Sequence, residues 1–263
     1  VDRVKSMRSF IERMNVQYGV LHAKKIPAIP AVLRERQFVE EYQIQRNDTY
    51  IVPVGLDYEE ISAVTIDLLQ IGTFSIIGRA QSGKSNLLYV IFEQLYKNMF
   101  SCPTDVYLLD GLTRGLHEFK EYGFVKEYSI DSDDLVNYIE NIYEVATERY
   151  EAMTKEEIDL KEEALMLVVV ENEMAIQSLC RNADALKKYK ELTGRLKAMK
   201  VCFIYSNIEN VSIPYSAPEI LKDIKDKKNF FFLNDLQNLK ICYVSTATLR
   251  SFKKKIGQGD GYW

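Results

Sequence analysis

The sequence is poor in the residues that build metal centres, disulfide frameworks and catalytic triads. Among its 263 residues are only two histidines, His22 and His117, which leaves little material for a His-rich metal site or a Ser-His-Asp triad. The cysteines lie far apart, with no C-x-x-C spacing: Cys102, Cys180, Cys202 and Cys242. We therefore expect reduced, buried thiols.

Long apolar runs are also missing. No stretch approaches the roughly 20 apolar residues that a membrane span needs, and no signal peptide opens the chain, so we expect it to be cytosolic. Because Val1 falls inside an apparent helix, we expect the chain to be a segment of a longer protein. Its 47% of hydrophobic residues is enough for one principal domain.

Positive charge is not in excess. The formal net charge is -4, which offers no overall attraction to nucleic acid or anionic lipid. The basic run Lys253 to Lys255 is short and is more typical of a solvated face than of a nucleic-acid contact. We therefore do not expect nucleic acid as a partner.

The first 48 residues differ in pattern from the rest. Residues Val4 to Met14 carry apolar side chains at helical spacing, and Pro27 and Pro30 in the segment IPAIP force an extended connection. Short β-rich runs follow. We predict a linker helix and extended entry segment over 1–48 and one folded domain over 49–263.

Strands and helices alternate along the predicted domain. The runs of strand length are YIVPVGL, AVTIDLL, FSIIG, VYLLD, ALMLVVV and VCFIYS. The unbroken β-branched run ALMLVVV predicts a strand buried on both faces, as in a parallel sheet covered by helices. Helical stripes run from Leu135 to Met153 and from Leu186 to Met199. The predicted fold class is α/β, with a mostly parallel central sheet and helices on both faces.

Residues 78–85 read GRAQSGKS and satisfy the phosphate-loop pattern G-x-x-x-x-G-K-[ST]. Glycines let consecutive amides point at phosphate oxygens from a helix N-terminus. Lys84 is expected to reach the β and γ phosphates, and Ser85 to bind Mg²⁺. We therefore predict a RecA-like P-loop NTPase with ATP and Mg²⁺ as cofactors. The predicted nucleotide-binding residues are Gly78, Arg79, Ala80, Gln81, Ser82, Gly83, Lys84, Ser85 and Asn86.

The motif after ALMLVVV departs from the usual one. Hydrolysis in this class usually needs an Asp-Glu pair, one carboxylate for the metal and one to activate water. Here Glu171 and Asn172 take those places. Glu171 is the predicted metal-binding and catalytic carboxylate. Asn172 cannot accept a proton at neutral pH. Glu173 can take the place of the missing base only if the strand end is displaced. The alternative is that these are simply polar residues at a strand exit.

Two further strand ends carry candidate residues. Asp110 ends VYLLD and is either a second carboxylate on the metal side or a loop cap. Ser206 and Asn207 close VCFIYS, where related folds place a sensor of the γ-phosphate; ordinary turn chemistry is the other interpretation.

The whole pattern resembles the FtsK/SpoIIIE-like ATPase domains of EssC/YukB-type coupling proteins in type VII secretion of Firmicutes. The resemblance is carried by IPAIP, VPVGLD, LLQIGTFSIIGRAQSGKSN, VYLLDG, ATERYEAM and GQGDG, and covers nearly the whole chain from Ile26 onward. The Glu-Asn substitution, and a chain that stops at Trp263, resemble the last of three tandem ATPase domains.

This resemblance implies a cytoplasmic domain of a cell-membrane protein that exports small helical WXG100-type proteins. It also implies neighbouring ATPase domains of the same protein and a hexameric ring in the full-length assembly. The isolated domain is compatible with a monomer. In related actinobacterial proteins the last domain binds a substrate's C-terminal tail in an apolar pocket. Arg149 in ATERYEAM matches an arginine of FtsK-like domains and is a candidate arginine finger. Otherwise it is an exposed helix arginine paired with Glu148 or Glu151.

Three functions are compatible with this pattern: a degenerate ATPase domain that docks secreted proteins, an active ATP-hydrolysing motor, and an FtsK-type DNA translocase. The net acidity and the lack of a winged-helix segment disfavour the translocase. Asn172 disfavours the motor. We therefore predict the degenerate, docking domain.

Overall fold

The computed structural model describes residues 2–18, 29–30, 32–34, 38, 50–98, 101–208, 216–252 and 255–263. Most of the predicted entry segment, including Pro27, lies outside these ranges, as do Lys253 and its neighbour at 254. The fold is therefore described for the domain that starts near Tyr50, together with one helix that precedes it.

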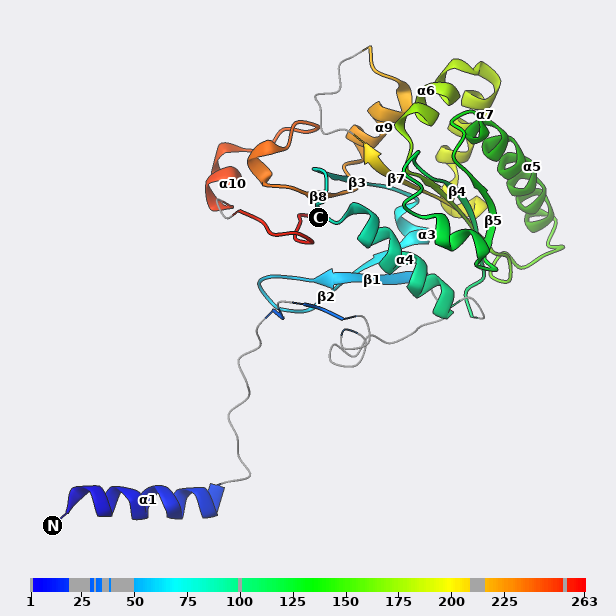
Figure 1. Cartoon of the computed structure of the whole chain (residues 1–263). Coiled ribbons are helices and arrows are strands. Elements are labelled where there is room, and N and C mark those ends of the chain that lie inside the picture. Colours follow the sequence, from blue (N-terminus) through cyan, green and yellow to red (C-terminus); the bar gives the residue numbers. More distant parts are fainter. Residues whose placement is uncertain are drawn as a thin grey trace.

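The centre of the domain is a six-stranded sheet in the order β5-β4-β6-β7-β3-β8 (Figure 1). Every neighbouring pair in this sheet is parallel, as the sequence predicts. The strands are β3 (Thr73–Gly78), β4 (Thr104–Leu109), β5 (Val125–Ser129), β6 (Leu165–Val170), β7 (Val201–Ile208) and β8 (Phe230–Leu233).

Two apolar layers cover the two faces of the sheet. One layer packs under α5 (Asp134–Thr154), α6 (Glu173–Arg181), α7 (Ala183–Gly194), α8 (Leu196–Met199) and α9 (Glu219–Lys227). The other packs under α3 (Leu68–Ile71), α4 (Lys84–Asn98) and the 3-10 turn η1 (His117–Glu121). Strand β6 serves both, because successive side chains alternate in direction: Met166, Val168 and Val170 join the first layer, and Leu165, Leu167 and Val169 the second. This confirms the prediction of a strand buried on both faces.

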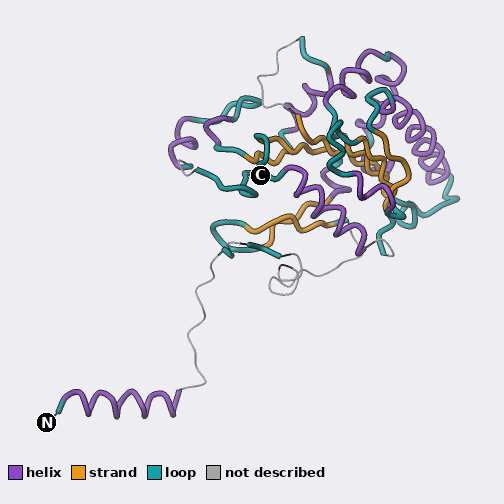
Figure 2. The backbone as a smooth tube through the Cα atoms, viewed as in Figure 1, coloured by secondary structure: helices purple, strands orange, loops and turns teal. Residues whose placement is uncertain are grey.

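A separate antiparallel hairpin of β1 (Ile51–Leu56) and β2 (Ala63–Asp67) lies beside α4 (Figure 2). The predicted strand AVTIDLL is shorter than expected because its last two residues start the helix α3. Asp67 explains the change: its Oδ1 accepts hydrogen bonds from the amides of Leu69 and Gln70, each at 3.0 Å, and so caps α3.

The helical stripe predicted from Leu186 to Met199 is wrong as one continuous helix. The helix α7 ends at Gly194, Arg195 has non-helical backbone angles, and α8 then begins. The sequence pattern did not predict α6, which is capped by Asn172 at its start and ends at Arg181. The next residue, Asn182, is the N-cap of α7. By contrast, α5 buries the predicted face, with Leu135, Ile139, Ile142 and Ala146 inside.

All four cysteines are free thiols. Cys102 and Cys202 are buried, whereas Cys180 and Cys242 are partly exposed, so the prediction of burial holds for two of them. No helix within the described ranges combines the length and apolar character that a bilayer span requires.

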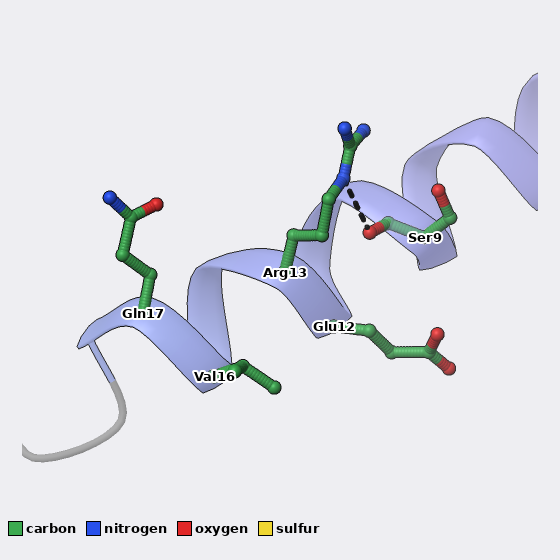
Figure 3. A pocket seen from close by; sticks show the side chains of 5 residues that line it. All are labelled: Ser9, Glu12, Arg13, Val16 and Gln17. Carbon is green, nitrogen blue, oxygen red and sulfur yellow. Dashed lines mark hydrogen bonds between the residues drawn. The ribbon is translucent and has the colours of Figure 1, made fainter.

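The chain has peripheral elements at both ends. Helix α1 (Arg3–Tyr18) matches the predicted helical spacing but buries none of its residues. The side chains that line one of its faces all come from this single helix, as Figure 3 shows, so they form a shallow surface without a second wall. After β8, the 3-10 turn η2 (Leu236–Asn238) and α10 (Thr246–Ser251) lead to a C-terminal segment that returns to the sheet through a bridge between Phe232 and Tyr262.

Candidate nucleotide site

The loop GRAQSGKS joins β3 to α4 at the carboxyl end of the parallel sheet, the edge where such folds bind ligands. Gly78 is the last residue of β3, and Lys84 is the first of α4. A Cβ atom on Gly78 would lie 2.5 Å from Ser82 Oγ and 2.9 Å from Leu233 Cβ, so only glycine fits there. Gly83 has a φ of +107°, which favours glycine. The segment between the two glycines is therefore a tight loop and not regular helix.

Lys84 bends back over this loop. Its ammonium donates to the carbonyl oxygens of Gly78 at 3.2 Å and Arg79 at 3.0 Å. Burial lowers the pKa of Lys84, and the nearby charge of Glu171 partly offsets that effect. The ammonium is thus held next to the loop amides, where a phosphate group would rest.

The two residues predicted to hold the metal meet in the structure. The hydroxyl of Ser85, at the start of α4, donates to Oε1 of Glu171 at 3.1 Å, across 86 positions of sequence. Hydroxyl and carboxylate oxygens suit Mg²⁺, which usually keeps only one or two protein carboxylates and completes its shell with water and phosphate oxygens. Within the described residues no group of three or more His, Cys, Asp or Glu forms a complete cage. These two residues therefore fit a Mg²⁺ ion that arrives with a nucleotide.

Asp110 lies beside Glu171 and is fully buried at the end of β4. It accepts hydrogen bonds from the amides of Gly111 at 2.8 Å and Leu116 at 3.0 Å, and from the hydroxyl of Tyr128 at 2.9 Å. The loop-cap interpretation of Asp110 is therefore confirmed. Burial, together with the adjacent Asp110, raises the pKa of Glu171 to about 7.

This raised pKa predicts how metal binding depends on pH. The folded protein keeps a proton on Glu171 up to about pH 7 in place of the ordinary 4.5, and Mg²⁺ requires the carboxylate form. We expect the Mg²⁺-dependent part of ATP affinity to increase as pH rises from 6 to 8. Titration calorimetry at several pH values measures it. For the same reason, the nucleotide-free protein should lose stability as pH rises from about 4.5 through about 7.

The matched control for this prediction is Glu171→Gln, which keeps the shape but cannot ionise. Titration of the ATP phosphates is common to both proteins and cancels in the comparison. Equal pH dependence of the two proteins would contradict the assignment of the proton to Glu171.

The residues after Glu171 serve the start of α6. Asn172 is its N-cap, and the side-chain oxygen of Asn172 accepts from the amide of Met174 at 3.0 Å. Glu173 is partly buried in the first turn, where a carboxylate suits the positive end of the helix dipole. Both have a structural role that sequence pattern alone did not assign.

Ser206 and Asn207 lie at the carboxyl end of β7, between β6 and the phosphate-loop strand β3. Ser206 pairs with Ile76 and Ile208 with Ile77, so Asn207 is an extra, bulged residue with a φ of 59° and an exposed side chain. Within the described part of the chain, the buried hydroxyl of Ser206 has no hydrogen-bond partner. β-Bulges are common beside binding sites, where they turn the end of a strand. The sensor role of Ser206 and Asn207 stays a prediction.

Arg149 lies near the amino end of β6, at the opposite end of the parallel strands from the phosphate loop. Its Nε is 3.0 Å from Glu163 Oε2, and its Nη1 donates to the carbonyl of Ala164 at 2.9 Å, just before β6 begins. Glu171 follows the opposite end of that strand, about 20 Å away for six extended residues. Arg149 is thus paired with Glu163, not Glu148 or Glu151, and can meet a nucleotide only on another molecule or domain.

The C-terminal segment also contacts the phosphate loop, which the sequence did not predict. The amide of Gly259 donates to the carbonyl of Ser82 at 3.0 Å, and this segment, α4 and the β1–β2 hairpin line a groove of about 900 Å³. The only sequence signal was the glycine-rich run GQGDG, which the resemblance contained without a role.

Comparison with known proteins adds relatives of one kind. The chain is 30% identical over 117 residues to the ESX secretion system protein EccC of Geobacillus thermodenitrificans. It is 30% identical over 153 residues to the ESX secretion system protein YukB of Bacillus subtilis. The chain is therefore similar to the EccC and YukB secretion proteins over part of its length. The matched regions cover 44% and 58% of this chain but only 8% and 10% of those proteins, and no family model matches.

Solved structures share the fold of this domain. The cytoplasmic domain of EssC superposes with a TM-score of 0.66 over 98% of this chain and 49% of its own, at 18% identity. Thermomonospora curvata EccC, ATPases 2 and 3 in complex with a signal sequence peptide, superposes with a TM-score of 0.63 over 91% of this chain and 42% of its own, at 18% identity. The chain therefore shares its fold with the ATPase domains of EssC and EccC.

Proposed function

We propose that the chain is a nucleotide-binding ATPase domain of a type VII secretion coupling protein, that it binds ATP with Mg²⁺, and that it hydrolyses ATP slowly or not at all. One observation carries the nucleotide part: a phosphate loop with Lys84 folded over it, and Ser85 in contact with Glu171 from the neighbouring motif. Lys84 and the loop amides would hold the phosphates. Ser85 and Glu171 would hold Mg²⁺, which neutralises phosphate charge when bound.

Weak hydrolysis follows from the absence of a free base beside the metal residues. Asn172 stands where the catalytic glutamate is expected, and its side chain is occupied as the N-cap of α6. Glu173 lies one residue further, in the first helical turn. Glu171, with a pKa raised to about 7, is needed at the metal. Among the residues that the structure describes, water activation therefore has no well-placed group.

The secretion role rests on the relatives. EccC and YukB are named as ESX secretion proteins, and the EccC structure of Thermomonospora curvata holds a signal sequence peptide. We therefore also propose that the domain docks small helical WXG100-type substrates. In this proposal it is the last of three ATPase domains in a cytoplasmic, membrane-anchored, hexameric assembly. An arginine finger role for Arg149 belongs to that ring: Arg149 would first have to leave Glu163.

The experiment that tests this proposal measures ATP binding and ATP turnover on the same purified chain. We expect calorimetry to detect Mg²⁺-ATP binding and a phosphate-release assay to give fewer than about 0.1 turnovers per second, well below the common range for enzymes. The control Asn172→Asp keeps a good N-cap and adds a carboxylate, so its unfolding free energy should match the wild type.

Two outcomes would contradict the proposal in different ways. No ATP binding would reject the nucleotide site. Turnover of several per second by the wild type would favour the alternative function, an active secretion motor. The docking role is tested separately with a substrate's C-terminal peptide, and no binding at millimolar peptide would reject it.

A further inference from the structure

Residues 256–263, the C-terminal strap, run directly along the phosphate loop. The amide of Gly259 donates to the carbonyl oxygen of Ser82 at 3.0 Å. The two backbones touch, because a Cβ built on Gly83 would lie 3.4 Å from Gly259 Cα and 3.5 Å from Gly259 N. The strap is thus a second wall of the loop, contributed from 176 positions further along the chain than Gly83 (259 minus 83).

This contact has a geometric consequence for the loop amides. A trans peptide is planar, so the carbonyl of one residue and the N–H of the next point in opposite directions. Ser82 and Gly83 share one such plane. When Gly259 holds the Ser82 carbonyl from the strap side, it fixes the Gly83 N–H toward the other side. Amides of this loop are the groups that contact phosphate oxygens.

We infer that the strap is a positioning element of the nucleotide site, with Gly259 as the residue that orients the Gly83 amide toward bound phosphate. The inference rests on the proposed function, because it assigns a further residue to that same site. Without the strap, the Ser82–Gly83 peptide is free to rotate about flanking bonds, and Gly83 has no Cβ to restrict that rotation. Binding would then have to restrict that motion at a cost in affinity.

The strap itself is anchored to the rest of the domain by several contacts, one of them from the amide of Ile256 to Oδ1 of Asp235 at 3.0 Å. Phe232 and Tyr262 exchange backbone hydrogen bonds of 2.8 and 3.0 Å, and the ring of Trp263 stacks on Phe231 with centroids 4.3 Å apart. Asp260 closes the turn by accepting from the amide of Gly257 at 2.8 Å. It also makes a side-chain hydrogen bond with Tyr58 of the turn between β1 and β2.

Glycine at 259 is required by conformation and not by space. Its φ is +86°, and no atom lies within 4 Å of a Cβ built there. An alanine would therefore meet no neighbour, but its backbone would be strained at this φ, and the strap would relax away from the geometry that aims its amide at Ser82. Gly259→Ala thus perturbs the contact without filling the site.

The test compares Gly259→Ala with the wild type for two probes, Mg²⁺-ATP and inorganic tripolyphosphate. We expect the dissociation constants of both probes to rise by the same factor, about tenfold, as for one backbone hydrogen bond lost. The melting temperature without nucleotide should change little, since the strap's other anchors remain. Asp260→Ala, which opens the turn from a different residue, should weaken both probes in the same direction.

The matched control is Gly123→Ala, a glycine on the surface with no atom within 4 Å of its Cβ and no positive φ. Unchanged affinity in Gly259→Ala, or an equal loss in Gly123→Ala, would overturn the inference. A loss for ATP but not for tripolyphosphate would also overturn it, because the strap would then hold the base or ribose. If the wild type binds neither probe, the proposed function fails, not this inference alone.

Discussion

Lys84→Ala is expected to raise the dissociation constant for Mg²⁺-ATP at least about 100-fold, because a positioned ammonium makes charge-assisted hydrogen bonds to phosphate that are each worth roughly 1.5–3 kcal/mol. In the structure its ammonium already lies over the loop, bonded to the carbonyls of Gly78 and Arg79. Two lost phosphate contacts give the expected factor. Calorimetry with ATP and Mg²⁺ measures it directly.

The same substitution should leave the fold in place. The side chain is partly exposed, and the two carbonyls it releases can bond to water. Lys126→Ala is the matched control, since Lys126 is an exposed lysine on β5 that pairs with Asp105, at 3.4 Å. The Lys126→Ala protein should bind ATP with the same affinity as the wild type. A Lys84→Ala protein that binds ATP as tightly as Lys126→Ala would remove the phosphate loop from the proposed function.

Asp110→Ala is the substitution with the largest expected effect on stability. It deletes a fully buried acceptor of three hydrogen bonds, and two buried amides and one half-buried hydroxyl lose that acceptor. At roughly 1–2 kcal/mol for each of the three groups, the free energy of unfolding should fall by about 3–6 kcal/mol. Urea denaturation, followed by circular dichroism, measures this change.

Tyr128→Phe is the graded control for Asp110. It removes only one of the three donors, at 2.9 Å, and keeps the aromatic ring that packs against His117. We expect a loss of about 1 kcal/mol, the usual net value of a single hydrogen bond. If Tyr128→Phe cost as much as Asp110→Ala, the two amides would contribute nothing, and the loop cap would be the wrong explanation of the burial.

Much of the fold followed from the sequence because its signals are local. The unbroken apolar run of β6 predicted burial on both faces, and the strand does serve both apolar layers. The break between α7 and α8 did not follow, because Leu196 and Met199 continue the apolar spacing across Gly194 and Arg195. Periodicity reports which side faces the core, and it is almost blind to a single residue that leaves helical geometry.

In the candidate site, too, some residues were predictable from the sequence and others were not. The phosphate loop was evident because G-x-x-x-x-G-K-[ST] lies within eight consecutive residues. The capping role of Asn172 was not evident, because it depends on where α6 begins. For Asp110 the sequence left the loop cap and the metal side open, and the amide of Leu116 and the hydroxyl of Tyr128 decided for the loop cap. Spacing gives no distance between side chains on different strands.

The sequence by itself determined a parallel α/β sheet, the phosphate loop and the departure at Glu171 and Asn172, since these are properties of contiguous residues. Only the tertiary structure decided that Ser85 meets Glu171, that Arg149 lies at the far end of the strands, and that Gly259 holds Ser82. The physical reason is that contacts between distant segments are set by how strands and helices pack in three dimensions, which local pattern does not encode.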